Sequence, residues 1–217
     1  MTLESKMPNS AKRLVVGKNS KVVADLKLDR EEYICVSHTD VNEFKVRGFF
    51  EDAIVFSYSK SLQENIKLLN NISRYTDNII YISTTSTVYS SAGMLYQYPT
   101  VKLVTENYLR NTKIFKNVLI IKLGIVISND TVWKKPGHYQ ITRTGLLKTA
   151  LKQTQQTGQI ECWEKTKIDF DNWLEKFMFV LYKKIQCRRT WRLLRLIDLI
   201  LKYMGYRWYG YGHRYQK

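Results

Sequence analysis

The stretch ISTTSTVYSSAGMLYQYPTVK, residues 82 to 102, joins the end of an apolar strand to a run of hydroxyl side chains, a tyrosine and a lysine. The pattern predicts a strand over 78–84 and a helix over 98–112. Tyr98 and Lys102 are four residues apart, so they share one face of that helix. An ammonium beside a phenol would lower the pKa of Tyr98 toward neutrality, and the tyrosine could then exchange a proton with a carbonyl or an alcohol.

A third side chain extends this interpretation. Thr85 stands at the end of the strand that precedes the helix, where its hydroxyl could hold an oxygen on which charge develops during a reaction. The simpler alternative is that Thr85, Tyr98 and Lys102 only occupy a strand end and a helix start. A tyrosine and a lysine four residues apart also occur by chance, so their place in the fold decides between the two interpretations.

Strands and helices alternate along the first part of the chain. Strands end in small or hydroxyl residues and are almost continuously apolar, which is typical of a parallel sheet that is buried on both faces. The expected strands cover 13–17, 32–38, 52–59, 78–84 and 117–127, and the expected helices cover 19–28, 61–76 and 98–112. Ser61 and Glu64 predict a capping box at the start of the second helix. The order predicts a doubly wound α/β domain, with ligands at the carboxyl ends of its strands.

The alternation weakens after residue 130. Helices are expected over 142–158, 169–185 and 190–205. We therefore predict three parts: a flexible N-terminus, residues 1–12; a Rossmann-like dinucleotide-binding domain, residues 13–130; and a small, mostly helical C-terminal substrate lobe with a basic aromatic tail, residues 131–217.

Charge and cysteine content limit the partners and the compartment. The 217 residues carry a net charge of +16, which favours an anionic partner. Three widely spaced cysteines form no CxxC pair, which argues against a disulfide framework or a metal site. The start shows no apolar signal segment, and no run of 18 uncharged apolar residues occurs. We expect a cytoplasmic, reduced protein.

The basic tail has two interpretations. Residues 183–217 hold ten Lys/Arg against the single acid Asp198, and an apolar helix with a polar stripe precedes the terminal aromatic residues. Residues 187–217 could contact an anionic membrane from its inner face. Alternatively, the tail packs on the sheet as part of the substrate lobe. Nucleic acid ranks third, because no recognition module is visible.

Two of these segments resemble the signatures of a known family. YISTTSTVYSS, residues 81–91, and YPTVKLVTENYL, residues 98–109, resemble the strand end and the catalytic helix of the short-chain dehydrogenase/reductase superfamily, in its extended NAD-dependent epimerase/dehydratase branch. The resemblance implies that Thr85 holds the substrate oxygen and Tyr98 is the general acid/base. It also implies that Lys102 lowers the pKa of the tyrosine and binds the nicotinamide ribose.

Other matches follow in the same order. ENIKLLNNI, residues 64–72, resembles the family helix with a structural asparagine, which implies that role for Asn65. Glu106 matches the acid of the catalytic helix, and IIKLGIV, residues 120–126, resembles the next strand. The resemblance covers about residues 13 to 130.

The cofactor loop departs from the family pattern. The family shows Gly-x-x-Gly-x-x-Gly after its first strand, whereas GKNSKVV keeps Gly17 and has Ser20 and Val23 at the other two positions. Lys18 or Lys21 could compensate by pairing with a phosphate. The resemblance implies a nicotinamide cofactor, NAD or NADP, and five binding residues: Gly17, Asn19, Ser20, Ser57 and Lys102.

The implied activity is an NAD(P)-dependent oxidoreductase or epimerase. Its substrate would be a nucleotide-linked or lipid-linked sugar, in surface polysaccharide synthesis, and a homodimer is expected by analogy with the family. The alternative is a degenerate, non-catalytic member that acts as a binding or scaffold subunit, because the glycine loop is broken.

Overall fold

A six-stranded sheet forms the centre of the computed structural model, which describes residues 12–87, 97–134, 137–152 and 157–170, and beyond them residues 172–174, 176, 177, 180, 200 and 203. The strand order is β2-β1-β3-β4-β5-β8, and every neighbouring pair is parallel. Its strands are β1 (Arg13–Val16), β2 (Tyr33–Val36), β3 (Ala53–Val55), β4 (Asn78–Thr84), β5 (Asn117–Leu123) and β8 (Gly158–Cys162).

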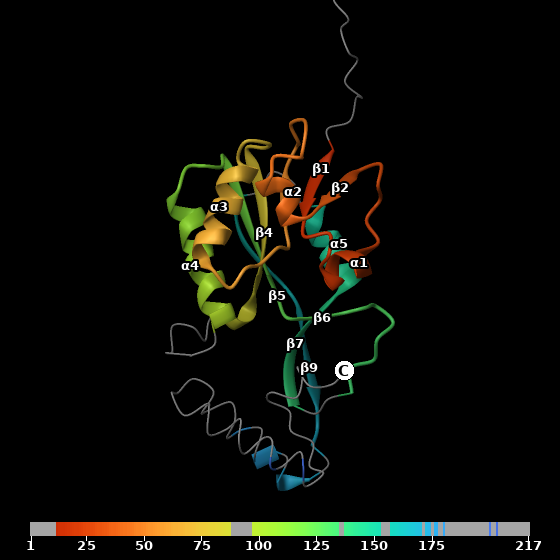
Figure 1. Ribbon diagram of the computed structural model, residues 1–217. Helices are drawn as coiled ribbons and strands as arrows, with labels where there is room; N and C mark the ends of the chain where they lie inside the picture. Colours follow the sequence, from red (N-terminus) through yellow and green to blue (C-terminus); the bar gives the residue numbers. More distant parts are fainter. Residues whose placement is uncertain are drawn as a thin grey trace, which may run out of the picture.

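Helices cover both faces of this sheet. In Figure 1, α3 and α4 lie on one side of the strands, and α1 and α5 lie on the other. The helices are α1 (Lys21–Leu26), α2 (His38–Asn42), α3 (Leu62–Ile72), α4 (Gln97–Asn111) and α5 (Thr144–Leu151). The predicted doubly wound, Rossmann-like α/β fold is therefore confirmed.

Two hydrophobic cores result from the alternation of side chains along the strands. Leu14 of β1 packs in a cluster with Leu69 of α3 and Leu109 of α4. The next residue, Val15, packs on the opposite face with a cluster that includes Leu26 of α1 and Leu147 of α5. Helices thus pack on both faces of the sheet, which explains why the strands are almost continuously apolar.

The long strand expected over 117–127 is divided at one glycine. A Cβ at Gly124 would lie only 2.2 Å from the carbonyl oxygen of Gln140, so no larger residue fits where β5 ends. After Gly124 the chain leaves the main sheet and enters a second, three-stranded sheet with the order β6-β7-β9. Its strands, below the main sheet in Figure 1, are β6 (Ile125–Ile127), β7 (Gly137–Arg143) and β9 (Glu164–Ile168).

The helix expected over 142–158 is wrong at both ends. Its first two residues belong to β7, α5 ends at Leu151, and Gly158 begins strand β8 instead of ending a helix. Sequence analysis also did not anticipate the three strands after residue 130, of which β8 pairs with β5 and extends the main sheet. The expected N-terminal segment and most of the helices expected over 169–185 and 190–205 lie outside the described residues.

A buried ion pair joins four elements at the amino end of the main sheet. Arg13 at the start of β1 is 3 % exposed, and its Nη2 lies 2.8 Å from Oδ2 of Asp52, which is 2 % exposed and directly precedes β3. Nη1 of Arg13 also donates to the hydroxyl of Tyr33 on β2 at 3.2 Å and to the carbonyl of Leu151 on α5 at 2.7 Å. The guanidinium therefore fixes both flanking strands and the C-terminus of a helix around β1.

Removal of the carboxylate should be costly. We expect Asp52→Ala to lower the free energy of unfolding by about 3–5 kcal/mol, because it leaves a guanidinium buried without its counter-ion. Denaturation in urea measures the loss. The control is Glu164→Ala, which breaks the partly exposed pair between Arg143 Nε and Glu164 Oε1 at 2.7 Å and should cost less than about 1 kcal/mol. Equal losses in both variants would contradict this role of Arg13.

Candidate active site

The centre of the candidate site is the place where the strand order reverses. β1 lies between β2 and β3, so the chain leaves its carboxyl end in one direction and returns in the other, as at the ligand crevice of open α/β sheets. Gly17, directly after β1, has φ +120°, and a Cβ there would meet the backbone nitrogen of Ser57 at 3.1 Å. The residues Gly17 and Ser57, both predicted to bind a cofactor, are therefore in contact.

The loop after β3 is held by the predicted structural asparagine. Asn65 on α3 is 5 % exposed, and its Nδ2 donates to the carbonyls of Ser59 and Ser61 at 2.8 Å each, while its Oδ1 accepts from the backbone of Ser59 at 2.9 Å. Only half of the predicted capping box forms: Ser61 accepts from the backbone of Glu64, whose carboxylate instead accepts from the Ser59 hydroxyl. Three side-chain hydrogen bonds of Asn65 thus fix the segment that presents Ser57.

This loop also contacts the predicted catalytic helix. Tyr58 packs edge-on against Tyr98 of α4, with ring centroids 4.6 Å apart. The ammonium of Lys102 lies 5.9 Å from the centre of the Tyr58 ring. The structure therefore brings the carboxyl end of β3 beside Tyr98 and Lys102, although 40 residues separate Tyr58 from Tyr98 along the sequence.

Lys102 is buried and has no salt-bridge partner among the described residues. The side chain is 2 % exposed, and its Nζ donates to the carbonyl of Ile82 on β4 at 2.7 Å and lies 4.5 Å from the ring centre of Tyr81. Burial lowers the pKa of Lys102 to about 7, with Glu106 acting weakly in the opposite direction. A buried lysine on α4 whose ammonium reaches the carboxyl half of β4 and whose pKa is lowered is a candidate for a functional group.

Tyr98 does not have the lowered pKa that the sequence predicts. Burial, followed by the charge of Tyr58, raises the pKa of Tyr98 to about 12. Lys102 does not offset this rise in pKa, because its ammonium donates to the Ile82 carbonyl. In this geometry the phenol keeps its proton at neutral pH and can donate it.

A second buried charge cluster lies one turn further along α4. Glu106 is 1 % exposed; one carboxylate oxygen accepts from the hydroxyl of Ser83 and the other lies 3.3 Å from Nζ of Lys122 on β5. Lys122 also donates to the hydroxyl of Thr87 at 3.0 Å. Sequence analysis matched Glu106 to a family acid but missed its partners. The signal was a lysine inside the otherwise apolar strand LIIKL, since such a charge needs a buried counter-ion.

The hydroxyl run after β4 is explained by these contacts, with one exception. Ser83 and Thr87 bond to the charge cluster, and the hydroxyls of Thr84 and Ser86 lie 3.0 Å apart. Within the described part of the chain, the Thr85 side chain makes no hydrogen bond, and it opens the short turn 85–87 in a half-buried position. Thr85, which is predicted to bind the substrate oxygen, is thus the residue of this run whose hydroxyl has no hydrogen-bond partner among the described residues.

The altered glycine loop folds without backbone strain, but its hydrogen-bonding groups are already bonded to other groups of the same chain. The backbone N–H of Lys18 donates to the Val36 carbonyl at 3.0 Å, and that of Ser20 donates to the Gly17 carbonyl at 2.8 Å. Val23 is 6 % exposed and packs in the core beneath α1, so it fills the contact between helix and sheet instead of disrupting it. Asn19 is exposed at the tip of the loop.

Lys18 meets a carboxylate from the end of the second strand. Its Nζ lies 3.0 Å from Oδ2 of Asp40. Asp40 also forms a capping box with Ser37 at the start of α2, and these hydrogen bonds hold the pKa of the Asp40 carboxyl well below its usual range. Lys18, expected to pair with a phosphate, is thus bound to a carboxylate of the chain itself. No group of three or more His, Cys, Asp or Glu within the described residues could hold a metal ion.

Comparison with solved structures gives the class of the fold. Chains that superpose on this one include dTDP-4-dehydrorhamnose reductase from Bacillus anthracis str. Ames in complex with NADP, at 11% identity, covering 82% of this chain and 83% of that chain with a TM-score of 0.53. Human epimerase family protein SDR39U1 with NADPH superposes at 9% identity, 70% and 74% coverage and a TM-score of 0.51.

A third neighbour is the Bordetella bronchiseptica enzyme WbmG in complex with NAD and UDP, at 11% identity, 71% and 74% coverage and a TM-score of 0.50. No protein-family model and no curated protein sequence matches the chain. The predicted likeness to the extended short-chain dehydrogenases/reductases is confirmed, and at 9–11% identity it is a likeness of fold.

The buried lysine gives a prediction with a defined pH dependence. Because the pKa of Lys102 is about 7 in the fold and about 10.4 in an unfolded chain, the unfolded chain binds the additional proton between these values, and the penalty for burying the charge is largest at or below pH 7. Lys102→Met should therefore raise the free energy of unfolding by more than about 1 kcal/mol at neutral pH. The gain should shrink as the pH rises toward 10. Denaturation at several pH values measures it.

Lys122→Met is the matched control, because it removes a buried lysine that does have a carboxylate partner. It leaves the Glu106 carboxylate with the Ser83 hydroxyl and, as its remaining ion-pair partner among the described residues, the guanidinium of Arg110 at 3.9 Å, and should lower the free energy of unfolding by about 3–5 kcal/mol. A loss of stability in both variants, or a gain from Lys102→Met that does not vary with pH, would contradict the assignment of Lys102.

Proposed function

We propose that the protein is an NAD(P)-dependent oxidoreductase or epimerase that acts on a nucleotide-linked or lipid-linked sugar. The observation that carries this proposal is Lys102, a buried lysine without a salt bridge among the described residues, one helical turn after Tyr98 and close to Tyr58 in the loop after β3. A fold does not retain such a costly group for stability.

Gly17 and Ser57 support a cofactor site, whereas the residues after Gly17 depart from the family pattern. Gly17 fits the close approach of a dinucleotide to the sheet, and Ser57 lies beside it. Asn19, Ser20 and Lys102 complete the expected binding set, and the bound nicotinamide would supply or accept a hydride. The backbone of Lys18 and Ser20 and the Lys18–Asp40 pair would have to release their present partners to meet a diphosphate.

The roles of the reacting residues follow from their protonation. Tyr98, with a pKa of about 12, holds its proton at neutral pH and would act as the general acid toward a keto group. Thr85 would hold the oxygen of that group.

The substrate class rests on the neighbours and on charge. The Bordetella enzyme was solved with NAD and UDP, and the Bacillus neighbour is named as a dTDP-4-dehydrorhamnose reductase. A net charge of +16 suits a diphosphate-linked sugar. A cytoplasmic role in surface polysaccharide synthesis and a homodimer belong to the same proposal.

A second candidate function is a binding or scaffold subunit without catalysis. It is favoured by the self-satisfied glycine loop, in which the Lys18 and Ser20 N–H groups and the Lys18 ammonium all bind the chain itself. Cofactor binding separates the two candidates.

The first test is a thermal titration with NAD(H) and NADP(H). A ligand at about 100 times its Kd adds about 2.7 kcal/mol, which raises the melting temperature by several degrees in a chain of this size. Ser20→Gly restores the second glycine of the family pattern, and since Ser20 makes no side-chain capping bond, the change costs the helix little. It should tighten cofactor binding. No shift with either cofactor, in either protein, would leave the scaffold as the function.

Catalysis by Tyr98 is tested separately. Tyr98→Phe should abolish turnover and leave the cofactor-induced thermal shift unchanged, because it removes only the hydroxyl and keeps the edge contact with Tyr58. Tyr108→Phe is the control, since that hydroxyl lies on the same helix but bonds to Asn70 at 2.7 Å. Turnover retained by Tyr98→Phe would exclude the tyrosine as the acid.

A further inference from the structure

Large apolar side chains are exposed in the C-terminal part of the described chain. In Figure 1 the described helical turns that follow Phe170, drawn in blue, lie beyond the end of β9. We call five exposed side chains the distal apolar surface: Trp173 (77% exposed), Phe177 (54%), Val180 (44%), Ile200 (52%) and Tyr203 (95%). Large apolar side chains left exposed to water are typical of an interaction site.

Their spacing places them on helix faces. Trp173, Phe177 and Val180 are helical and stand at positions i, i+4 and i+7, which lie within one stripe of an α-helix. Ile200 and Tyr203 are helical and three residues apart, so they also share a face. These five described side chains are all helical, aromatic or aliphatic, and exposed.

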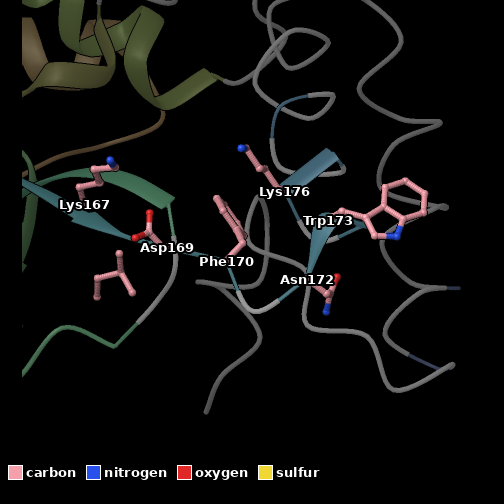
Figure 2. A pocket seen from close by; sticks show the side chains of 7 residues that line it. Lys167, Asp169, Phe170, Asn172, Trp173 and Lys176 are labelled. Carbon is pink, nitrogen blue, oxygen red and sulfur yellow. The ribbon is translucent and has the colours of Figure 1, made fainter.

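Two lysines lie near Trp173, one member of this surface. Trp173 lines a cavity of about 540 Å³ together with Lys167, Asp169, Phe170 and Lys176. Figure 2 shows the Trp173 ring directed away from Lys167 and Asp169. The sequence that follows is strongly basic, with ten Lys/Arg against one acid over residues 183–217.

The combination selects one class of partner. A second copy of the chain would bring the same positive charge against itself, which opposes self-association. A nucleic acid would satisfy the cations and stack on aromatic rings, but it would leave the aliphatic Val180 and Ile200 uncovered. An anionic lipid surface offers phosphate for the lysines and acyl chains for the apolar side chains.

We propose that the distal apolar surface docks the protein onto an anionic membrane. Trp173 and Tyr203 would sit at the interface, where amphipathic rings are favoured, with Phe177, Val180 and Ile200 beneath the headgroups. Among the described residues, no helix is both long and apolar enough to cross a bilayer, so the contact is in the plane of the membrane. The docking site begins at Trp173, before the tail 187–217, and does not depend on the cofactor.

The test is sedimentation of the full chain with vesicles of phosphatidylcholine alone and with added phosphatidylglycerol. The variant is Trp173→Ser/Phe177→Ser. The control is Phe49→Ser/Val132→Ser, because those side chains are similarly exposed, 65% and 73%, but lie elsewhere. Both proteins are first compared with the wild type by thermal melting.

The wild type and the control should bind the phosphatidylglycerol vesicles, and high salt should weaken the binding. The variant should bind about tenfold more weakly, because affinity for an interface scales with the apolar area buried. Equal binding by variant and control would overturn the proposal, as would failure of the wild type to bind. Self-association or oligonucleotide binding that only the variant loses, without vesicle binding, would assign the surface to a protein or nucleic acid instead.

Discussion

The parallel pairing of β1 with both β2 and β3 is the constraint on which the rest of the molecule depends. It forces the chain to leave the central strand toward one face and to return on the other, so the loops after β1 and β3 meet at a single edge. Gly17 is required there because a Cβ would press on the backbone of Ser57. This contact also sets the position of the next residue, Tyr58, which packs edge-on against the ring of Tyr98.

The two buried lysines next to this edge illustrate opposite uses of a charge. Lys122 is paired with Glu106, so burial is compensated and the pair joins α4 to β5. Lys102 has only a backbone carbonyl as acceptor among the described contacts, and its charge is destabilised. Sites that perform chemistry commonly hold groups that a stable fold would avoid. The contrast between Lys122 on β5, with its ion pair, and Lys102 on α4, without one among the described residues, is the physical argument for the proposed activity.

The candidate site and the distal apolar surface differ in chemistry. One holds a phenol and a buried ammonium beside the loop that follows β3, and the other consists of exposed aromatic and aliphatic side chains. A protein held at an anionic membrane would meet lipid-linked sugars at high local concentration. The two proposals together therefore favour the lipid-linked alternative over a freely diffusing nucleotide sugar.

The sequence by itself determined the alternation of strands and helices, the Rossmann-like topology and the shared helix face of Tyr98 and Lys102, because these follow from apolar periodicity and local spacing, while Asn65 was singled out by a family resemblance. The tertiary structure decided the surroundings of these side chains. Burial and the neighbouring Tyr58 raise the pKa of Tyr98, and the Lys102 ammonium donates instead to a carbonyl of β4, 20 residues away in sequence. The role of Gly124 likewise depends on Gln140 of another strand. Electrostatics and close packing are set by neighbours in space, and only the folded chain specifies them.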